Sequence, residues 1–466
     1  MFSRIKLFLV LICTVSVFLT GLEAFAKQSQ KPNILFIAID DLNDMVPILD
    51  EKAVVTTPNL SKLAKRSTVF KNAFTSSTLC NPSRFSLLTG LNPSSTGVYL
   101  NTTNSLLVEN EYLNIMTYLK KFGYKTIGVG KIFHGTQNQE SAWDIYHGYE
   151  KNRLATKKSH NIWPRNWGVV KEKFLDLRDR LVTDKALEYV SEEFDQPTFL
   201  AIGFHNPHLP WFYTKEIYDK YAIPLSKIER PEEPDYILSD LPDSAKTFAI
   251  QYNAFDQSNY HEKVINQGEW KKAIQAYLVG VSYMDEKLGV LLEAFYASPN
   301  AENTIVILWS DHGYHLGEKH HWNKHALWEK TTHVPLMFSF PGQKAVENQC
   351  VVSLLDVFPT IIDALNLPKL DHLEGQSLLQ IMFTENAIWD NHALTTMDYK
   401  NHSVRGICWR YTKYKDGSEE LYDKKFDPNE FFNLAEYKSL KRVKKRLRGF
   451  LPEDNHKALP EEVFEH

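Results

Sequence analysis

Four short apolar segments, rich in β-branched residues, constrain the fold of this 466-residue chain more than any other feature. They are Asn33–Ile39, Thr126–Gly130, Thr198–Phe204 and Thr304–Ser310. Apolar runs of this length are typical of strands that are buried on both faces of a sheet. Segments of helical periodicity lie between them, among them 57–67, with Thr57 as the expected N-cap, and Trp270–Phe295. The alternation predicts an α/β fold with a parallel sheet flanked by helices.

Each of these predicted strands is followed by ionisable side chains. In chain order they are Asp40 and Asp41, Lys131 and His134, His205 and His208, and Asp311 and His312. Ligands of such sheets bind beyond the carboxyl ends of the strands, so residues far apart in the sequence are brought to one rim. One polar strand end would mean little, but four that carry ionisable groups predict a shared site.

The aspartates of this set, together with one imidazole, predict a metal site. Asp40 and Asp41 repel each other unless a cation lies between them. Carboxylate oxygens favour Ca²⁺ or Mg²⁺, whereas a structural zinc site would need more cysteine or histidine. An acidic turn would explain the first pair alone, but the addition of Asp311 and His312 favours a metal.

Cys80 lies in the polar, turn-like stretch Ser76–Gly90. A thiolate nucleophile needs a nearby cation, and Arg84 would lie on the same face of a helix that begins near Pro82. A small buried hydrophobe is the usual role of a lone cysteine. The polar flanking residues argue against that role here.

The residues Cys80-Asn81-Pro82-Ser83-Arg84, followed by Thr89-Gly90, resemble the sulfatase signature C-x-P-S-R with a later Thr-Gly pair. Further elements agree in the same order from Pro32 to Ala435. They are PNILFIAIDDL, GKIFHG, HNPHLPW, SDHGYHLGEKHHWNK, HVPLMFSFPG and ELYDKKFDPNEFFNLA. As a set they are most similar to the iduronate-2-sulfatase-like branch of the formylglycine-dependent, type I sulfatases.

The resemblance implies a fold, a division into domains and a set of site residues. The fold is alkaline-phosphatase-like, with a mixed, mainly parallel sheet flanked by helices and a smaller C-terminal α+β subdomain. A catalytic domain at 27–380 and a subdomain at 381–466 are expected. The implied metal ligands are Asp40, Asp41, Asp311, His312 and the modified Cys80, and the implied catalytic residues are Cys80, Arg84, Lys131, His134, His208 and Lys324. His205 belongs to the same element, with a less certain role.

In the family that the chain resembles, a formylglycine-generating enzyme converts the signature cysteine to an aldehyde, and the metal is Ca²⁺ rather than Mg²⁺. The hydrated aldehyde at position 80 attacks sulfur and later expels sulfate, which a serine there could not do. His208 would protonate the leaving oxygen and His134 would take the second proton, although which histidine is acid and which is base stays open. The implied cations Arg84, Lys131 and Lys324 would neutralise the sulfate ester.

The expected function is therefore an exported sulfatase that hydrolyses sulfate esters of a sulfated carbohydrate. A phosphonate or phosphate ester hydrolase of the same superfamily is the main alternative. A non-catalytic protein that binds sulfated glycans is a further alternative, but it would require broken site residues. The net charge of −4 gives no indication of nucleic-acid binding.

The first 26 residues read as a signal peptide. Arg4 and Lys6 precede an apolar run, and Ala24-Phe25-Ala26 provides a small-x-small cleavage site. An uncleaved anchor is the alternative, although the run is short for a membrane span. We expect a periplasmic or secreted protein without a membrane span after cleavage. A disulfide between Cys350 and Cys408 stays open.

Several other segments admit two interpretations. The histidines of residues 315–325 form either a substrate loop, which we favour, or a second metal site; they are His315, His320, His321 and His325. Trp211, Trp322 and Trp328 either stack on sugar rings or pack the loops. The basic segment Lys151–Lys173 is either a lid or a solvated insertion. Residues 441–450 predict a last amphipathic helix, with Leu440, Val443 and Leu447 on its apolar face. Tyr221–Glu269 shows no clear pattern.

Overall fold

A computed structural model describes residues 31–108, 111–135, 140–148, 167–170, 177–251, 260–383 and 388–461. The predicted signal peptide lies outside these ranges. So does most of the predicted lid segment, of which the structure describes only β5 (Trp167–Val170). None of the described helices combines the length and the hydrophobicity that a membrane span requires.

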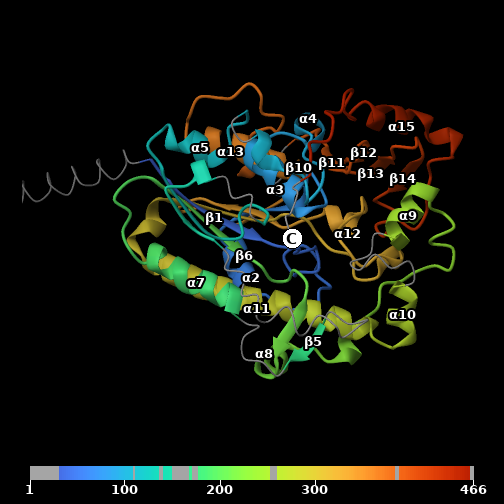
Figure 1. Ribbon diagram of the computed structural model, residues 1–466, viewed down its shortest axis with the longest axis horizontal. Helices are drawn as coiled ribbons and strands as arrows, with labels where there is room; N and C mark the ends of the chain where they lie inside the picture. Colours follow the sequence, from blue (N-terminus) through green and yellow to red (C-terminus); the bar gives the residue numbers. More distant parts are fainter. Residues whose placement is uncertain are drawn as a thin grey trace, which may run out of the picture.

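A sheet of eight strands forms the centre of the molecule, in the order β10-β2-β9-β8-β1-β6-β3-β4 (Figure 1). The strands are β1 (Asn33–Ile39), β2 (Thr68–Phe74), β3 (Lys125–Gly130), β4 (Ile145–His147), β6 (Thr198–Phe204), β8 (Thr304–Ser310), β9 (Leu336–Ser339) and β10 (Val346–Ser353). β1 pairs in parallel with β6 and β8, and β9 runs antiparallel to both of its neighbours. The sheet is therefore mixed and mainly parallel, which confirms the predicted fold class.

Burial explains why the strand bounds follow from the sequence. β1, β6 and β8 have the predicted bounds, and β3 begins one residue earlier than predicted, at Lys125. All seven residues of β1, of β6 and of β8 are buried. Side chains on both faces of such a strand must be apolar, so the first ionisable residue marks the end of the strand.

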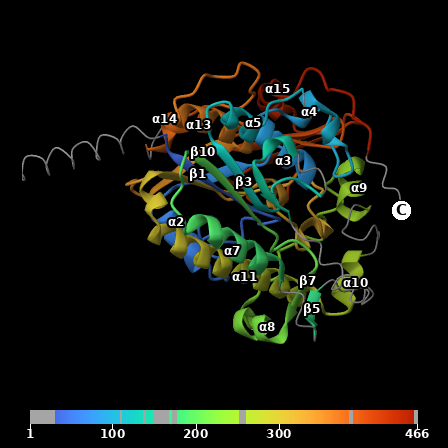
Figure 2. The ribbon, with the colours of Figure 1, turned by 60° about the vertical axis from the view of Figure 1, so that its left-hand side comes forward.

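Helices cover both faces of the sheet (Figures 1 and 2). The alternate residues Leu35, Ile37 and Ile39 of β1 pack with α2 (Pro58–Ala64), α7 (Leu177–Val190), α8 (Lys215–Tyr221) and α11 (Trp270–Ala297). The residues between them pack with α3 (Cys80–Thr89), α5 (Ile115–Lys120), α13 (Val357–Ala364) and α14 (Leu379–Met382). Two separate cores therefore hold β1 between them, and its carboxyl end is fixed from both sides.

The start of α2 shows a detail that the sequence does not give. Thr57 is the N-cap residue, as predicted, but its side chain makes no capping hydrogen bond and its buried hydroxyl has no partner. The carboxylate of Asp285 on α11 accepts hydrogen bonds from the backbone N–H groups of Asn59 and Leu60 instead. A side chain distant in sequence therefore does the work of the cap.

A four-stranded antiparallel sheet forms the C-terminal part of the chain. Its strands are β11 (Ala393–Met397), β12 (Asn401–Arg405), β13 (Trp409–Lys413) and β14 (Glu419–Asp423), followed by α15 (Lys441–Arg448). Leu447 of α15 is buried, and Leu440 and Val443 pack beside it, as expected for the last amphipathic helix. The division at residue 380 stays a prediction.

A group of charged side chains joins this sheet to the helix α12 (Glu329–Thr332). We call it the bridging cluster; its members are Glu329, Arg405, Arg410, Lys424 and Glu430. Arg410 Nε donates to Glu430 Oε1 at 2.7 Å, and Lys424 Nζ lies 3.1 Å from the same oxygen. Each carboxylate oxygen of Glu329 and Glu430 accepts a hydrogen bond.

The described part of Tyr221–Glu269, which shows no clear pattern in the sequence, contains regular structure. α9 (Asp243–Gln251) and α10 (Tyr260–Asn266) both lie within it. Ala245 and Ala249 of α9 are buried against Leu327 and Tyr414. Because these helices are short, they leave little hydrophobic periodicity in the sequence.

Candidate active site

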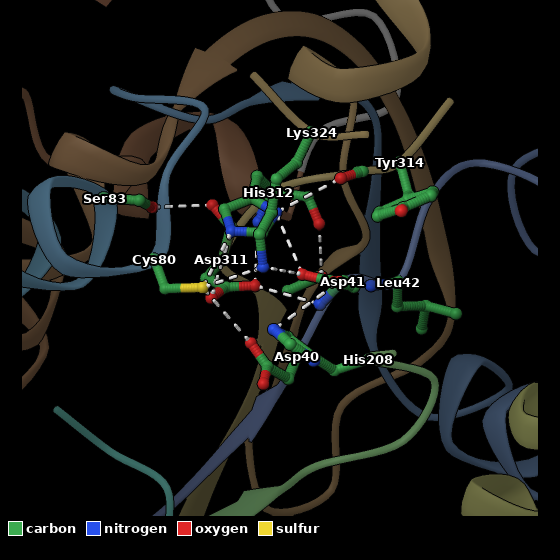
Figure 3. Close-up of polar contacts among 12 residues, drawn as sticks. Asp40, Asp41, Leu42, Cys80, Ser83, His208, Asp311, His312, Tyr314 and Lys324 are labelled. Atoms are coloured by element: carbon green, nitrogen blue, oxygen red, sulfur yellow. Dashed lines mark hydrogen bonds and ion pairs between the residues drawn. The ribbon is translucent and has the colours of Figure 1, made fainter. Parts of the chain in front are cut away.

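The sulfur of Cys80 is the point on which the predicted site residues converge (Figure 3). Cys80 is the first residue of α3 and has no exposed surface. Its Sγ atom lies 3.1 Å from Lys324 Nζ, 3.3 Å from His312 Nε2 and 3.6 Å from Lys131 Nζ. Three sequence-distant segments therefore meet at one side chain.

Cations around Cys80 favour the ionised sulfur. Burial raises the pKa of the thiol, but the ammonium groups of Lys131 and Lys324 outweigh it and hold that pKa well below its usual range. The amino terminus of α3 adds positive potential at the same place. The pocket is thus arranged to hold negative charge at residue 80.

Gly90, the second residue of the Thr-Gly pair, ends α3. Its backbone is left-handed, with φ +73°, and a Cβ there would lie 2.4 Å from Leu373. Both facts explain why a glycine stands at this position. The carboxyl end of α3, the helix that begins with Cys80, therefore packs closely against Leu373.

Arg84 has a different place from the one that the sequence suggests. Its guanidinium donates to Asp311 Oδ2 at 2.8 Å, to Asp40 Oδ1 at 3.2 Å, and to the backbone carbonyls of Lys131 and Ile132. It is completely buried, and the cations that lower the pKa of Cys80 most are Lys131 and Lys324. Arg84 therefore connects the residues that follow β1, β3 and β8.

Each of the two adjacent aspartates is paired with a lysine. Lys131 Nζ lies 2.5 Å from Asp40 Oδ2, and Lys324 Nζ lies 2.8 Å from Asp41 Oδ1. Burial lowers the pKa of Lys324, but Asp41 and Cys80 raise it further, so the net shift is well above its ordinary value. Both lysines also reach the Cys80 sulfur. We call Asp40, Asp41, Arg84, Lys131, Asp311 and Lys324 the site cluster.

The backbone after β1 is held in an unusual conformation. Asp41 has a φ of +61°, in the left-handed region that few non-glycine residues adopt. The hydroxyl of Tyr277 donates to the Asp41 carbonyl at 2.9 Å and accepts from the Asn43 N–H at 2.9 Å. Asp311 Oδ1 accepts from the Asp41 N–H. Tyr277 was missed as a site residue because, in the sequence, it reads only as part of an apolar helix face.

Asp311 is fixed through both its backbone and its side chain. The hydroxyls of Thr75 and Ser83 donate to its carbonyl oxygen at 2.7 and 2.6 Å. Burial raises the pKa of the carboxyl to about 6, against the lowering effect of Arg84. His312 Nε2 lies 3.5 Å from Asp311 Oδ2 and its Nδ1 lies 3.4 Å from Asp41 Oδ1.

The histidines after β6 approach the same carboxylates. His205 Nδ1 lies 3.5 Å from Asp40 Oδ2, and His208 Nε2 lies 3.9 Å from Asp41 Oδ2. Arg178 donates to His205 Nε2 at 2.7 Å. The carboxylate of the buried Asp179 accepts a hydrogen bond from the backbone N–H of His205 at 2.6 Å. These two residues at the start of α7 position the loop, and nothing in their local sequence marks them.

His134, which follows β3, lies beside Cys80. Burial lowers its pKa, although contact with the Cys80 sulfur acts in the opposite direction. Its Nδ1 atom is buried and has no hydrogen-bond partner in the described part of the chain. The structure thus brings together every residue that the sequence proposes for the site.

The donor atoms fit a hard divalent cation. Ligand atoms of Asp40, Asp41, Cys80 and His208 lie within 4.8 Å of one another, and so do those of Cys80, Asp311 and His312. Asp41 Oδ2 is buried and has no hydrogen-bond partner among the residues that the structure describes, which is costly for a carboxylate oxygen. A bound cation would satisfy it, and carboxylate oxygens favour Ca²⁺ or Mg²⁺.

The four histidines of residues 315–325 do not form a metal site together. Only His320 joins another group of ligands, with Glu233 and His261. The indole N–H of Trp322 donates to His261 Nδ1 at 3.0 Å, which places the imidazole proton on Nε2, the nitrogen that faces Glu233. His261 and His320 are also stacked, with their rings 7° from parallel, and a cation could not lie in both ring planes.

The three tryptophans near the rim pack the loops. Trp211 and Trp322 are 1% exposed and Trp328 is 2% exposed, so none presents a ring face to a sugar. Trp322 stacks on Trp167, and Trp211 packs edge-on against Tyr314. The interpretation of these residues as a stacking surface is therefore wrong.

Comparison with known proteins identifies the family. The profile of the family described as Sulfatase matches residues 32–367, and the profile described as N-sulphoglucosamine sulphohydrolase, C-terminal, matches residues 317–457. A sulfatase of Formosa agariphila is 35% identical over 97% of this chain and 92% of its own length. Human iduronate 2-sulfatase is 32% identical over 67% of this chain and 60% of its own length.

Solved structures show the same fold. A 2-O GAG sulfatase superposes with a TM-score of 0.70 at 23% identity, covering 90% of this chain and 91% of that one. A phosphonate monoester hydrolase of Agrobacterium radiobacter gives a TM-score of 0.74 at 18% identity, covering 90% and 94%. The chain belongs to the sulfatase family and is a sulfuric ester hydrolase.

Proposed function

We propose that this chain is an exported sulfatase that removes sulfate from a sulfated carbohydrate, with Ca²⁺ in its site and formylglycine at residue 80. The observation that carries the proposal is the convergence of three buried aspartates and two lysines on the Cys80 sulfur. Burying charged side chains around a thiol lowers the stability of the fold unless those charges bind a ligand. The pattern fits a reaction in which a dianion-like transition state is stabilised.

Asp40, Asp41, Asp311 and His312 would hold the cation beside residue 80. The bound cation supplies fixed positive charge, and the oxidised side chain supplies a hydroxyl nucleophile. Lys131 and Lys324 reach the sulfur of residue 80 and therefore also the position of a sulfate attacked there. Their charges would neutralise the sulfate ester, while the hydrogen bonds of Arg84 hold Asp40 and Asp311 in position.

Two histidines, which follow the neighbouring strands β6 and β3, would transfer the protons. His208 follows β6 and is half-buried, which suits a group that protonates the leaving oxygen of a substrate entering from outside. His134 lies against residue 80, where its Nδ1 or Nε2 atom would take a proton from the hydroxyl there. Catalysis of this kind contributes roughly 10²–10⁴-fold.

The names of relatives support a carbohydrate substrate. A human relative is named iduronate 2-sulfatase, and a structural neighbour is a 2-O GAG sulfatase. We propose a sulfated polysaccharide or its oligosaccharides as the substrate and a formylglycine-generating enzyme as the maturation partner. The amino-terminal pattern supports export to the periplasm or beyond, with cleavage after Ala26.

Mass spectrometry of the peptide that contains residue 80, combined with sulfate release from a panel of sulfated glycans, tests the proposal. We expect an aldehyde at residue 80 in the active chain and activity that chelation abolishes and Ca²⁺ restores. A Cys80→Ala variant should lose at least roughly 10⁴-fold in kcat/KM. An unmodified thiol in fully active protein would exclude the formylglycine mechanism.

The phosphonate hydrolase alternative has its own measurement. Its structural support is the TM-score of 0.74, which at 18% identity concerns the fold alone. We expect an aryl sulfate to be turned over faster than an aryl phosphodiester or phosphonate by the same preparation. Faster turnover of the phosphodiester or phosphonate would instead indicate that the protein hydrolyses phosphorus esters. The site residues are intact, so a protein that only binds glycans is disfavoured.

A further inference from the structure

The last helix carries cations that the fold does not use. Residues 438–448 contain seven lysines and arginines and no acidic residue, in a chain with a net charge of −4. Lys444 and Arg448 bind Glu419, and Arg446 binds Asp390. No described carboxylate forms an ion pair with the remaining four, which we call the cationic stripe: Lys438, Lys441, Arg442 and Lys445.

The helical spacing of the cationic stripe places its members on one side of the helix. Lys445 follows Lys441 by four residues and Arg442 by three, the spacing of neighbours on a helix surface. Lys438 lies one turn earlier, in η7 (Lys438–Leu440), and all four are exposed. Leu440, Val443 and Leu447 lie on another side and pack against the C-terminal sheet. α15 lies at the outer edge of the molecule (Figure 1). With its apolar side already buried, this helix cannot insert into a bilayer in the way of a membrane-surface helix.

A cavity of aromatic character lies beside the cationic stripe. Its volume is about 610 Å³, within the range of sites for small ligands. The ring-bearing residues that line it are Trp389, His392, Trp409 and Phe450. Arg446 also lines it, and a turn of 100° per residue places Arg446 on α15 between the stripe and the cavity. Cations and ring faces thus adjoin on one surface.

We propose that the cationic stripe and this cavity form an accessory binding site for a sulfated polysaccharide, separate from the site around Cys80. Sulfate groups would bind the lysines and arginines, and a sugar ring would lie against the aromatic walls. Only the choice of polymer rests on the proposed function. Attachment at a second site raises the local concentration of sulfate esters at the first, without any change in the chemistry there.

Binding is measured on the full chain with Cys13→Ser and Cys80→Ala, so that the polymer is not hydrolysed. The probes are a sulfated carrageenan and the same polymer after chemical desulfation. We expect the triple change Lys441→Gln, Arg442→Gln and Lys445→Gln to weaken binding of the sulfated polymer roughly tenfold and to flatten its salt dependence. The matched control changes three exposed lysines elsewhere: Lys65→Gln, Lys121→Gln and Lys227→Gln. It should change the affinity less than twofold.

The remaining thiols of that chain report on the cavity. Cys350 and Cys408 both line it, and no disulfide joins them among the described residues. We expect the sulfated polymer to slow maleimide labelling of Cys408 several-fold, and the desulfated polymer to leave the rate unchanged. A Cys350→Ser form assigns the signal to Cys408.

Three results would overturn the accessory site. They are equal weakening by the stripe and control variants, equal affinity for the desulfated polymer, and tighter binding to phosphatidylserine vesicles or to a DNA duplex than to carrageenan. In the background with Cys80 intact, turnover of a small aryl sulfate by the triple variant should stay within twofold. Absence of that turnover in every form would reject the proposed function and leave the binding result standing.

Discussion

The site cluster and the bridging cluster are built from the same kinds of residue, yet they differ in how their oxygens are used. In the bridging cluster every carboxylate oxygen of Glu329 and Glu430 accepts a hydrogen bond. In the site cluster Asp41 Oδ2 is buried and accepts no hydrogen bond from the described part of the chain, and two lysines point at a sulfur atom. A completed network holds two parts of a fold together, whereas an incomplete one is suited to a ligand. The comparison teaches that burial and charge alone do not mark a functional site.

The largest expected effect is a loss of activity when Asp41 is replaced, because its Oδ2 atom accepts no hydrogen bond from the described residues. Asp41→Asn should lower kcat/KM for an aryl sulfate by at least about 10³-fold, because it removes a charge that holds the cation. It should also remove the rise in Tm that Ca²⁺ gives to the parent chain. A variant that keeps the calcium-induced rise would show that Asp41 is not a ligand.

The bridging cluster should show the opposite behaviour. Glu430→Gln leaves Arg410 and Lys424, both buried, without a full counter-charge, and should cost about 3 kcal/mol of unfolding free energy in urea. The calcium-induced rise in Tm should persist. If Asp41→Asn destabilised the chain as much as Glu430→Gln does, the distinction between the two clusters would fail.

A third buried carboxylate, Asp356, tests what happens when no cation is near. It accepts hydrogen bonds from the Ser353 and Gln376 N–H groups, and burial raises its pKa to about 6. A folded-state pKa above the unfolded value means that stability is greatest at low pH and falls as pH rises from about 4 to 6. We expect the unfolding free energy of the parent chain, relative to Asp356→Asn, to fall by about 2 kcal/mol between pH 4 and pH 7.

The smallest effects are changes in unfolding free energy at the start of α2, where the hydrogen-bonded Asp285 carboxylate and the Thr57 hydroxyl are compared. Asp285→Asn should cost about 1 kcal/mol, because the carboxylate accepts the Asn59 and Leu60 N–H groups. Thr57→Val should be neutral or slightly stabilising, because the buried hydroxyl that it removes makes no hydrogen bond. Urea unfolding of both variants checks the pair, and a larger loss from Thr57→Val would reject the assignment of the cap.

Buried strands explain how much could be predicted from sequence. Because β1 and β8 are buried along their whole length, their apolar runs end where Asp40 and Asp311 begin, and the topology then fixes that these ends meet. The position of Cys80 beside them follows from the family signature rather than from periodicity. The C-terminal amphipathic helix follows instead from the helical spacing of Leu440, Val443 and Leu447.

Contacts between distant side chains could not be predicted. Tyr277 looks like any other apolar residue of α11, although its hydroxyl holds the backbone of Asp41. The saturation of Arg84 by Asp40 and Asp311 likewise depends on geometry that no local pattern encodes. The sequence leaves open whether Trp322 stacks on a sugar or packs the loops; in the structure it is buried and its N–H fixes the tautomer of His261.

The complete burial of α3 has a consequence for how the active protein is made. All ten residues of this helix, Cys80 included, are inaccessible once the chain has folded. If residue 80 is converted to formylglycine as proposed, the modifying enzyme would have to act before the chain folds. Molecules that fold first would be native but inactive, so the specific activity of a preparation would then depend on the supply of the modifying enzyme as well as on correct folding.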